Sequence, residues 1–239
     1  MVMACEHDPI LPWSFELWGR GVTAVAGVDE VGVGALAGPV IAAAVILAPG
    51  TIIKGLADSK LLTAKRREVV FAVIAECAVA IGLGCSEVEE VDRLNVYWAA
   101  MEARRRAVEA LPTTPGHVLV DGKRRIAGCR LSQTPVVGGD ALSSSIAAAS
   151  IVAKVTRDSL MGEYAQLHPG YGFERHKGYG TADHIQALGR LGPLPLHRRL
   201  FAPVWKVGGA QLQLVPWGGQ PQKERKATGL KPGGEGLSG

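Results

Sequence analysis

The chain has 239 residues, 47% of them hydrophobic and 20% charged, which excludes a largely disordered protein and leaves room for one sizeable folded domain. The formal net charge is only +4, and the residues from 206 onward supply +3 of it through five Lys/Arg and two Glu. A uniformly basic nucleic-acid-binding domain is therefore excluded, and any contact with nucleic acid has to come from local clusters.

The cysteines and the apolar stretches point to the compartment. The four cysteines form no C-x-x-C pair and no zinc-binding spacing, so we expect free thiols in a reducing environment. They are Cys5, Cys77, Cys85 and Cys129. The first residues lack the apolar run of a signal peptide, and the longest apolar stretch, 35–48, is too short to cross a bilayer. We expect a soluble, cytoplasmic protein.

The hydrophobic pattern predicts strands and helices in an α/β order that starts with a β-hairpin. Polar residues that can cap helices precede the helical segments, and Ser86 with Glu89 matches a capping box. Strands are expected at 23–28, 39–47, 78–84, 117–120 and 135–137. Helices are expected at 63–77, shortly after Ser86, from Asn95 to about 111, at 146–167 after Ser143 or Ser144, and from Thr181 to about 191. The helix at 146–167 carries Ala and Ser along one side, so we expect another element to pack closely against it.

Four carboxylates follow the predicted strands or lie in adjoining loops: Asp29, Glu30, Asp121 and Asp140. The ends of two strands in one sheet can lie side by side, which would bring these groups together. Neighbouring residues in a strand point to opposite faces, so Asp29 and Glu30 reach one site only if the strand ends or bulges there. Crowded carboxylates repel unless they bind a proton or a cation, and a ligand set of oxygens suits Mg²⁺ or Mn²⁺. For any one of these acids alone, a turn or a surface position is the simpler interpretation.

A glycine-rich loop, Gly32-Val-Gly34-Ala-Leu-Ala-Gly38, follows the first strand. One interpretation is a dinucleotide-binding loop, which would make the protein an oxidoreductase. That fingerprint requires a helix after the glycines, whereas here the third glycine falls one residue late and a strand-like run follows. The other interpretation is that backbone N–H groups approach a sugar-phosphate closely and read a ribose 2′-OH.

Taken together, these segments resemble the ribonuclease HII family. The resemblance covers residues 23–204 and rests on motifs that keep the family's order. They are GVDEVGVGALAGPVIAAAVIL, DSKLLTAKRRE, VDRLN, VLVDG, GDALSSSIAAASIVAKVTRD, HPGYGFERHKGYGTADH and GPLPLHRRLFAPV.

The resemblance implies a ribonuclease H-like fold, with a central mixed β-sheet flanked by helices and a small helical C-terminal part. The catalytic domain is then expected at 21–205. The weak pattern of residues 1–20 predicts a loosely attached lead-in, and the Gly/Pro-rich, aperiodic composition of residues 206–239 predicts a disordered basic tail that matches nothing in the family. The implied enzyme is a metal-dependent endonuclease that cuts the RNA strand of RNA–DNA hybrids and nicks DNA on the 5′ side of embedded ribonucleotides. The products would carry a 3′-OH and a 5′-phosphate.

The resemblance also assigns roles to individual residues. Asp29, Glu30, Asp121 and Asp140 become the ligands of two Mg²⁺ or Mn²⁺ ions. Gly32, Val33 and Gly34 become the loop that reads the 2′-OH, and Tyr179 becomes the residue that stacks on a sugar at the RNA-to-DNA junction. Lys60, Asn95, Lys154 and Arg157 match positions expected to hold phosphates.

The chain departs from the family pattern at several positions. Val33 stands where the family usually has a cation, Leu61 and Leu142 replace residues that are often Lys, and Lys123 stands where Asn is common. The loss of cations predicts weaker substrate binding, and it motivates an alternative: a relative that binds hybrids without cutting them. We expect a monomer with no membrane contact. A contact with a sliding clamp is possible, but no motif in the sequence supports it.

Overall fold

The computed structural model describes residues 17, 19–22, 24–56 and 62–208. The lead-in up to residue 16, Lys60, Leu61 and the tail from 209 therefore lie outside the described residues. Contacts divide the chain after Gly208, and only the first unit is described below. Within the described part, no helix combines the length and apolar character needed to span a membrane.

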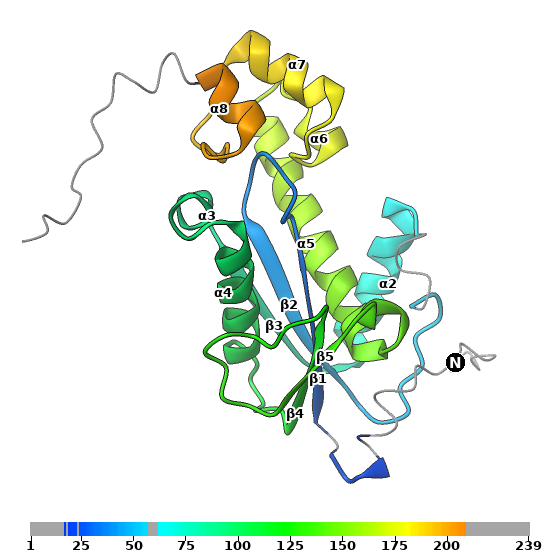
Figure 1. Ribbon diagram of the computed structural model, residues 1–239. Helices are drawn as coiled ribbons and strands as arrows, with labels where there is room; N and C mark the ends of the chain where they lie inside the picture. The colour runs from blue at the N-terminus through cyan, green and yellow to red at the C-terminus, as the bar shows by residue number, and fades with distance from the viewer. Residues whose placement is uncertain (1–16, 18, 23, 57–61, 209–239) are drawn as a thin grey trace, which may run out of the picture. The chain divides into compact units, whose positions relative to one another are not determined.

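Five strands form one mixed sheet in the order β3-β2-β1-β4-β5, as Figure 1 shows. Strand β2 pairs antiparallel with both β3 and β1. Strand β4 pairs parallel with both β1 and β5. The strands are β1 (Val25–Val31), β2 (Val40–Leu47), β3 (Ala78–Ser86), β4 (His117–Asp121) and β5 (Gln133–Val136). The α/β order and the opening hairpin are thus confirmed.

Helices cover both faces of the sheet, and a group of short helices gathers at one end of the long α5 (Figure 1). The helices are α2 (Ala64–Cys77), α3 (Val88–Leu94), α4 (Val96–Glu109), α5 (Ser144–Leu167), α6 (Phe173–His176), α7 (Ala182–Leu191) and α8 (Ala202–Gly208), with a 3-10 turn, η2, at Gly139–Ala141. The short α6 and α8 were not predicted. Helix α8 continues past residue 205, where the domain boundary was expected.

Most of the predicted caps are present, but one is not. Asn95, Ser143 and Thr181 each accept a hydrogen bond from the first turn of the following helix, as predicted. Thr63, for which no cap was predicted, does the same for α2. Ser86 does not cap α3, because its hydroxyl donates to the carbonyl of Ala99 at 2.8 Å and ties β3 to α4. The predicted capping box is therefore wrong.

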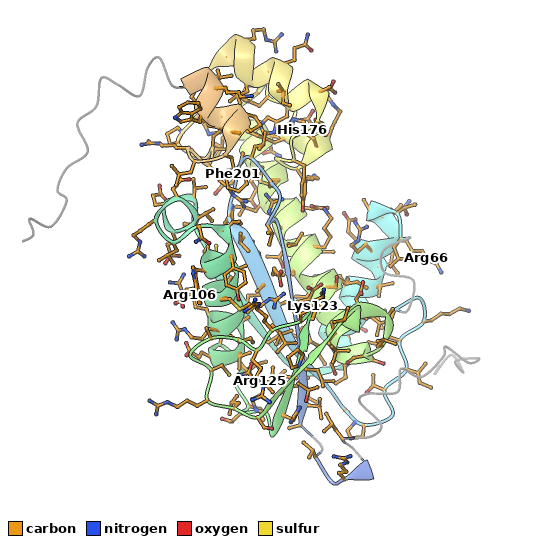
Figure 2. All side chains as sticks on the ribbon, viewed as in Figure 1. Arg66, Arg106, Lys123, Arg125, His176 and Phe201 are labelled. Atoms are coloured by element: carbon orange, nitrogen blue, oxygen red, sulfur yellow. The ribbon has the colours of Figure 1, made fainter. Side chains whose placement is uncertain are left out.

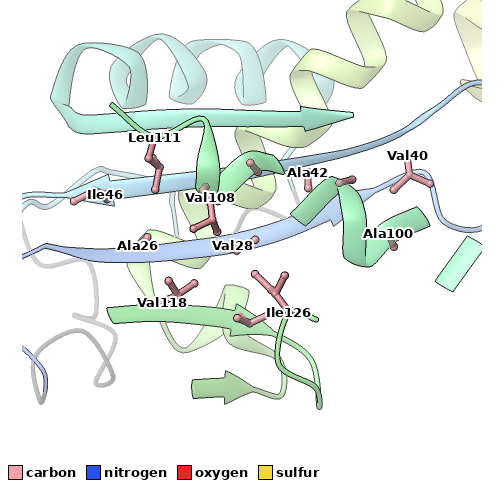
Figure 3. Packing of buried hydrophobic residues seen from close by; sticks show 14 of the residues in the cluster. Ala26, Val28, Val40, Ala42, Ile46, Ala100, Val108, Leu111, Val118 and Ile126 are labelled. Carbon is pink, nitrogen blue, oxygen red and sulfur yellow. The ribbon is translucent and has the colours of Figure 1, made fainter. Parts of the chain in front are cut away.

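Alternating residues of β1 and β2 build two cores on opposite faces of the sheet. Ala26, Val28 and Ala42 pack with α4, as Figure 3 shows for one face. Ala43 and Val45 point the other way and pack with α5. This period of two decides which helix each later residue of β1 faces.

Glycines let the helices approach the sheet more closely than a side chain would allow. A Cβ on Gly27 would lie 2.1 Å from the backbone of Ser145 in α5, and one on Gly84 would lie 2.0 Å from the carbonyl oxygen of Ala103 in α4. The close packing predicted for α5 is thus confirmed, with β1 as the partner.

We predict that Gly84→Ala destabilises the protein by about 3 kcal/mol, because two segments of backbone would have to separate. Gly162→Ala is the matched control: Gly162 lies in α5 with nothing within 4 Å of an added Cβ, so alanine should stabilise by roughly 0.5–1 kcal/mol. Urea unfolding of both variants measures the difference. Equal stability of the two variants would contradict the close packing.

Candidate active site

The parallel pairing of β1 with β4 brings two of the predicted acids next to each other. Val28 of β1 pairs with Val120 of β4. Asp29 and Asp121 are the next residues of the two strands, so they occupy neighbouring positions at the end of β4. Asp29 is partly buried and accepts a hydrogen bond from the side chain of Ser150 on α5.

Glu30 points to the other face of the sheet. A single shared site for Asp29 and Glu30 would require the strand to end or bulge at Asp29. The register of β1 with β2 is instead unbroken from Ala26 to Val31. Asp29 therefore faces α5, whereas Glu30 faces α4. The two acids flank the end of β4 from opposite sides.

Asp121 connects this strand end to the fourth acid. Its Oδ1 accepts a hydrogen bond from the backbone N–H of Gly139 at 2.8 Å. Gly139 opens the 3-10 turn that carries Asp140, whose side chain is buried. Three predicted acids thus belong to one connected group of strand end and turn.

The site has a strongly negative electrostatic character. Burial, followed by the charges of Glu30 and Asp121, raises the pKa of Asp29 to about 7. Burial also raises the pKa of Glu30, although the adjacent Arg104 opposes the shift. Carboxyl groups with such raised pKa values gain from any cation that enters the site.

Arg104 on α4 is a functional residue that the sequence analysis missed. Its guanidinium donates to the Glu30 carboxylate through Nε and Nη2, and its side chain is only 9% exposed. A signal was present in the sequence, because Arg104 lies on the apolar face of α4 between Ala100 and Ala107. A buried arginine in that position needs an acidic partner.

The donor set suits a hard divalent cation, with one condition. All the candidate ligands are carboxylate oxygens, which Mg²⁺ and Mn²⁺ prefer. Among the described residues, however, no three His, Cys, Asp or Glu side chains already converge on a common point. Coordination by Glu30 together with the other acids requires Glu30 to turn away from Arg104.

The glycine loop lies beside these acids and is followed by a strand, not a helix. Gly32 has φ +92°, and a Cβ there would meet Arg157 at 2.3 Å, so the fold itself requires this glycine. Gly34 is exposed and has open space around it. Because β2 follows the loop, the geometry of a dinucleotide-binding site is absent here.

Two buried arginines hold the glycine loop in place. Arg157 donates to the carbonyl oxygens of Ala37, Pro39 and Lys177 at 2.8–2.9 Å. Arg198 donates to those of Gly38 and Val33 at 2.8–3.0 Å. Arg157 is fully buried, so the expectation that it contacts a phosphate is corrected: its guanidinium is used inside the protein.

The remaining predicted substrate residues lie around the loop. Tyr179 forms a β-bridge with Ala35, and the cationic groups of Lys154 and Arg157 lie 5.8 and 5.4 Å from its ring centroid. Lys154 also forms an ion pair with Asp158 at 2.7 Å. Asn95 is exposed, and its side-chain oxygen caps α4.

A chain of three hydrogen bonds supports Tyr179 from behind. The N–H of Leu194 donates to Nδ1 of His197 at 2.9 Å, so neutral His197 carries its proton on Nε2. This proton points to Nε2 of His184, 3.1 Å away, and His184 in turn donates from Nδ1 to the carbonyl oxygen of Tyr179 at 2.9 Å. Both rings are fully buried, and the relay works only while both are neutral.

Comparison with known proteins places the whole folded part in one family. The family model for ribonuclease HII matches residues 26–204. The ribonuclease HII of Anaeromyxobacter sp. (strain Fw109-5) is 52% identical over 227 residues, covering 95% of this chain and 70% of that protein. The ribonuclease HII of Nitrobacter winogradskyi is 57% identical over 190 residues, covering 79% of this chain and 72% of that protein.

Solved structures support the fold. The ribonuclease H2 of Pyrococcus horikoshii OT3 superposes with a TM-score of 0.66 at 24% identity, covering 78% of this chain and 97% of that one. Bst-RNase HIII in complex with Mn²⁺ gives a TM-score of 0.67 at 21% identity, covering 89% and 77%. The ribonuclease HII of Archaeoglobus fulgidus, solved in complex with PCNA, gives 0.63 at 21% identity, covering 74% and 95%.

We predict that the histidine relay makes stability depend on pH. Burial, followed by the charge of His184, lowers the pKa of His197 from 6.5 to about 4. Between these values the unfolded chain binds a proton that folded His197 does not, so stability is full above pH 6.5 and falls as the pH falls toward 4, by on the order of 3 kcal/mol.

Urea unfolding across this pH range tests the prediction in the wild type and in His197→Gln. Glutamine cannot take up the proton, so the variant should lose less stability on acidification, although it is less stable at neutral pH. The same loss in both proteins would show that His197 does not titrate in this way.

Proposed function

The chain belongs to the ribonuclease HII family, which consists of metal-dependent endonucleases of the ribonuclease H type. We propose the following reaction for it. The protein hydrolyses the RNA strand of RNA–DNA hybrids and nicks DNA on the 5′ side of embedded ribonucleotides. A water oxygen bonds to phosphorus as the water gives up a proton, the P–O3′ bond breaks, and the departing 3′-oxygen takes up a proton, so that one water is consumed. The products carry a 3′-OH and a 5′-phosphate.

The observation that carries the proposal is the pairing of β1 with β4, because it places Asp29 beside Asp121 at the open end of β4. Asp121 in turn holds the turn that carries Asp140. We propose that these three acids and Glu30 hold Mg²⁺ or Mn²⁺. When bound, such ions lower the pKa of the attacking water and stabilise the leaving oxygen.

The residues around the acids supply positioning. Ser150 orients the Asp29 carboxylate through its hydrogen bond, and the Gly139 N–H orients Asp121. Gly34 has neither a positive φ nor a crowded Cβ position, so the fold does not require glycine there. We propose that the close approach of a ribose, read through its 2′-OH by the loop backbone, accounts for this glycine.

Tyr179 and Lys154 complete the proposed substrate contacts at the loop. The bridge to Ala35 places Tyr179 next to the glycines, where its ring can stack on a sugar. Lys154 lies beside that ring and can contact a phosphate. We further propose that Asn95, and Lys60 outside the described residues, contact phosphates.

One of the solved structures described above contains a protein partner. PCNA accompanies the Archaeoglobus fulgidus protein in its solved structure. At 21% identity that likeness concerns the fold. We therefore propose no clamp contact for this chain.

The decisive experiment uses a labelled DNA duplex that contains one ribonucleotide, incubated with Mg²⁺, Mn²⁺ or EDTA. We expect a nick on the 5′ side of the ribonucleotide with metal, none with EDTA, and none on an all-DNA duplex. Asp29→Asn should abolish nicking without loss of stability, because asparagine is isosteric and relieves the repulsion in the cluster. Tight binding without any nick would favour the alternative of a hybrid-binding relative.

A second prediction concerns Arg104. Arg104→Met should cost about 3 kcal/mol of stability in EDTA, because Glu30 loses its cationic partner. Saturating Mn²⁺ should restore most of the lost stability. The variant should also bind Mn²⁺ more tightly than the wild type does, because Glu30 is then available as a ligand.

Urea unfolding with and without Mn²⁺, together with calorimetric titration of Mn²⁺, measures both effects. Arg105→Met is the control, because the ion pairs of Arg105 with other described residues involve Glu102 and Glu109 on α4 and none of the four acids. If Mn²⁺ fails to restore the stability of Arg104→Met, Glu30 is not a metal ligand.

A further inference from the structure

A groove of about 310 Å³ opens beside the acids, between α4 and the loop that follows β4. Glu30 and Asp121 lie at one side of it, so the groove is continuous with the candidate active site. Val33 of the glycine loop and Met101 of α4 contribute an apolar wall. We call it the α4 groove.

Two cations of the β4–β5 connection line the α4 groove: Lys123 and Arg124. Both are exposed, and neither forms an ion pair with another described residue. Figure 2 shows Lys123 near the end of β4, with Arg125 on the same loop. The connection 122–132 contains four cations and no acid. Lys123 and Arg124 are therefore available for an anionic ligand.

The arginines of α4 differ, because each is already paired. Arg104 is paired with Glu30, Arg105 with Glu102 and Glu109, and Arg106 with Glu90. The positive charge that the groove offers to a ligand thus comes from the β4–β5 connection and not from the helix.

An exposed aromatic residue forms the third part of the groove. Tyr97 lies in the first turn of α4, is 41% exposed, and has the Arg124 guanidinium 6.0 Å from its ring centroid. Trp98 packs edge-on against it, with ring centroids 5.1 Å apart and an interplanar angle of 77°. The backbone N–H of Tyr97 donates to Oδ1 of Asn95 at 3.0 Å, at the start of the helix. Exposed cations beside an aromatic ring can hold a backbone phosphate of a duplex while the ring packs against the adjoining sugar.

We propose that the α4 groove binds one nucleotide of the substrate duplex next to the cleaved linkage. Lys123 and Arg124 contact its phosphate, and Tyr97 packs against its sugar. This assignment rests on the proposed function, because the groove can hold part of the substrate only if the acids beside it are the site of cleavage. Val33 lines the same groove without a charge, so Lys123 and Arg124 of the β4–β5 connection supply its unpaired positive charge.

Binding of the full-length protein to a fluorescent duplex with one ribonucleotide tests the proposal. Measurements in EDTA over a series of salt concentrations separate binding from cleavage. Lys123→Gln with Arg124→Gln should weaken binding roughly tenfold or more at moderate salt and reduce the slope of log K against log salt by about 2. Tyr97→Leu should weaken binding about fivefold without changing that slope, because it removes a contact of the aromatic ring but no charge.

Arg125→Gln with Arg130→Gln is the matched control, because it removes the same charge from the same connection but from residues that do not line the groove. Its effect on the slope should be clearly smaller. Val33→Arg, added to the Lys123/Arg124 double variant, should restore about one unit of the slope, since the new side chain would enter the same groove. Thermal unfolding confirms that every variant is folded.

Three outcomes overturn the proposal: an equal effect of the two double variants, an unchanged affinity of Tyr97→Leu, or no rescue by Val33→Arg. The nicking assay of the wild type keeps the two proposals apart. If the wild type nicks and the groove variants bind like the wild type, only the groove assignment fails. If the wild type binds without nicking and the variants weaken binding as expected, the groove stands and the proposed reaction fails.

Discussion

The repulsion between carboxylates at the end of β4 is the constraint on which the rest of the site depends. Asp29, Glu30 and Asp121 are brought together by strand pairing, and burial raises the pKa of two of them. The fold stabilises the group with an N–H from Gly139, a hydroxyl from Ser150 and a guanidinium from Arg104. Arg104 supplies the only full positive charge among these three. The site therefore keeps a net negative charge, which a metal ion can neutralise.

The alternation along β1 explains why the site involves both layers of helices. Asp29 faces α5 and Glu30 faces α4, so each acid is supported by a different helix. Gly27 and Gly84 bring these helices close to the sheet. The distance that the supporting side chains of the helices have to span to reach the acids is therefore short. Packing in the core and the geometry of the site are thus consequences of the same small residues.

Residues with a local signal could be predicted from the sequence, and residues defined by distant contacts could not. The strands, the long helices and the Asn95 cap follow from periodicity and from neighbouring residues. The family motifs name the four acids, but only the strand pairing shows that Asp29 and Asp121 are neighbours and that Glu30 points to the other face of the sheet. Arg157 was misplaced because three carbonyl oxygens far away in the sequence bury its guanidinium. Ser86 failed as a cap because the carbonyl of Ala99, across the sheet–helix interface, is its partner.

The bond from Arg198 to the carbonyl oxygen of Gly38 joins residues 160 positions apart. During synthesis from the N-terminus, the β1–β2 hairpin can form early. The loop between these strands lacks its hydrogen bonds from Arg198 until that residue has been synthesised. Contacts of such long separation also form late in folding, because closing a long loop costs entropy before the contact is made. The glycine loop is therefore completed late, so a nascent or truncated chain that ends before residue 198 carries the four acids without the arginine that holds this loop in place.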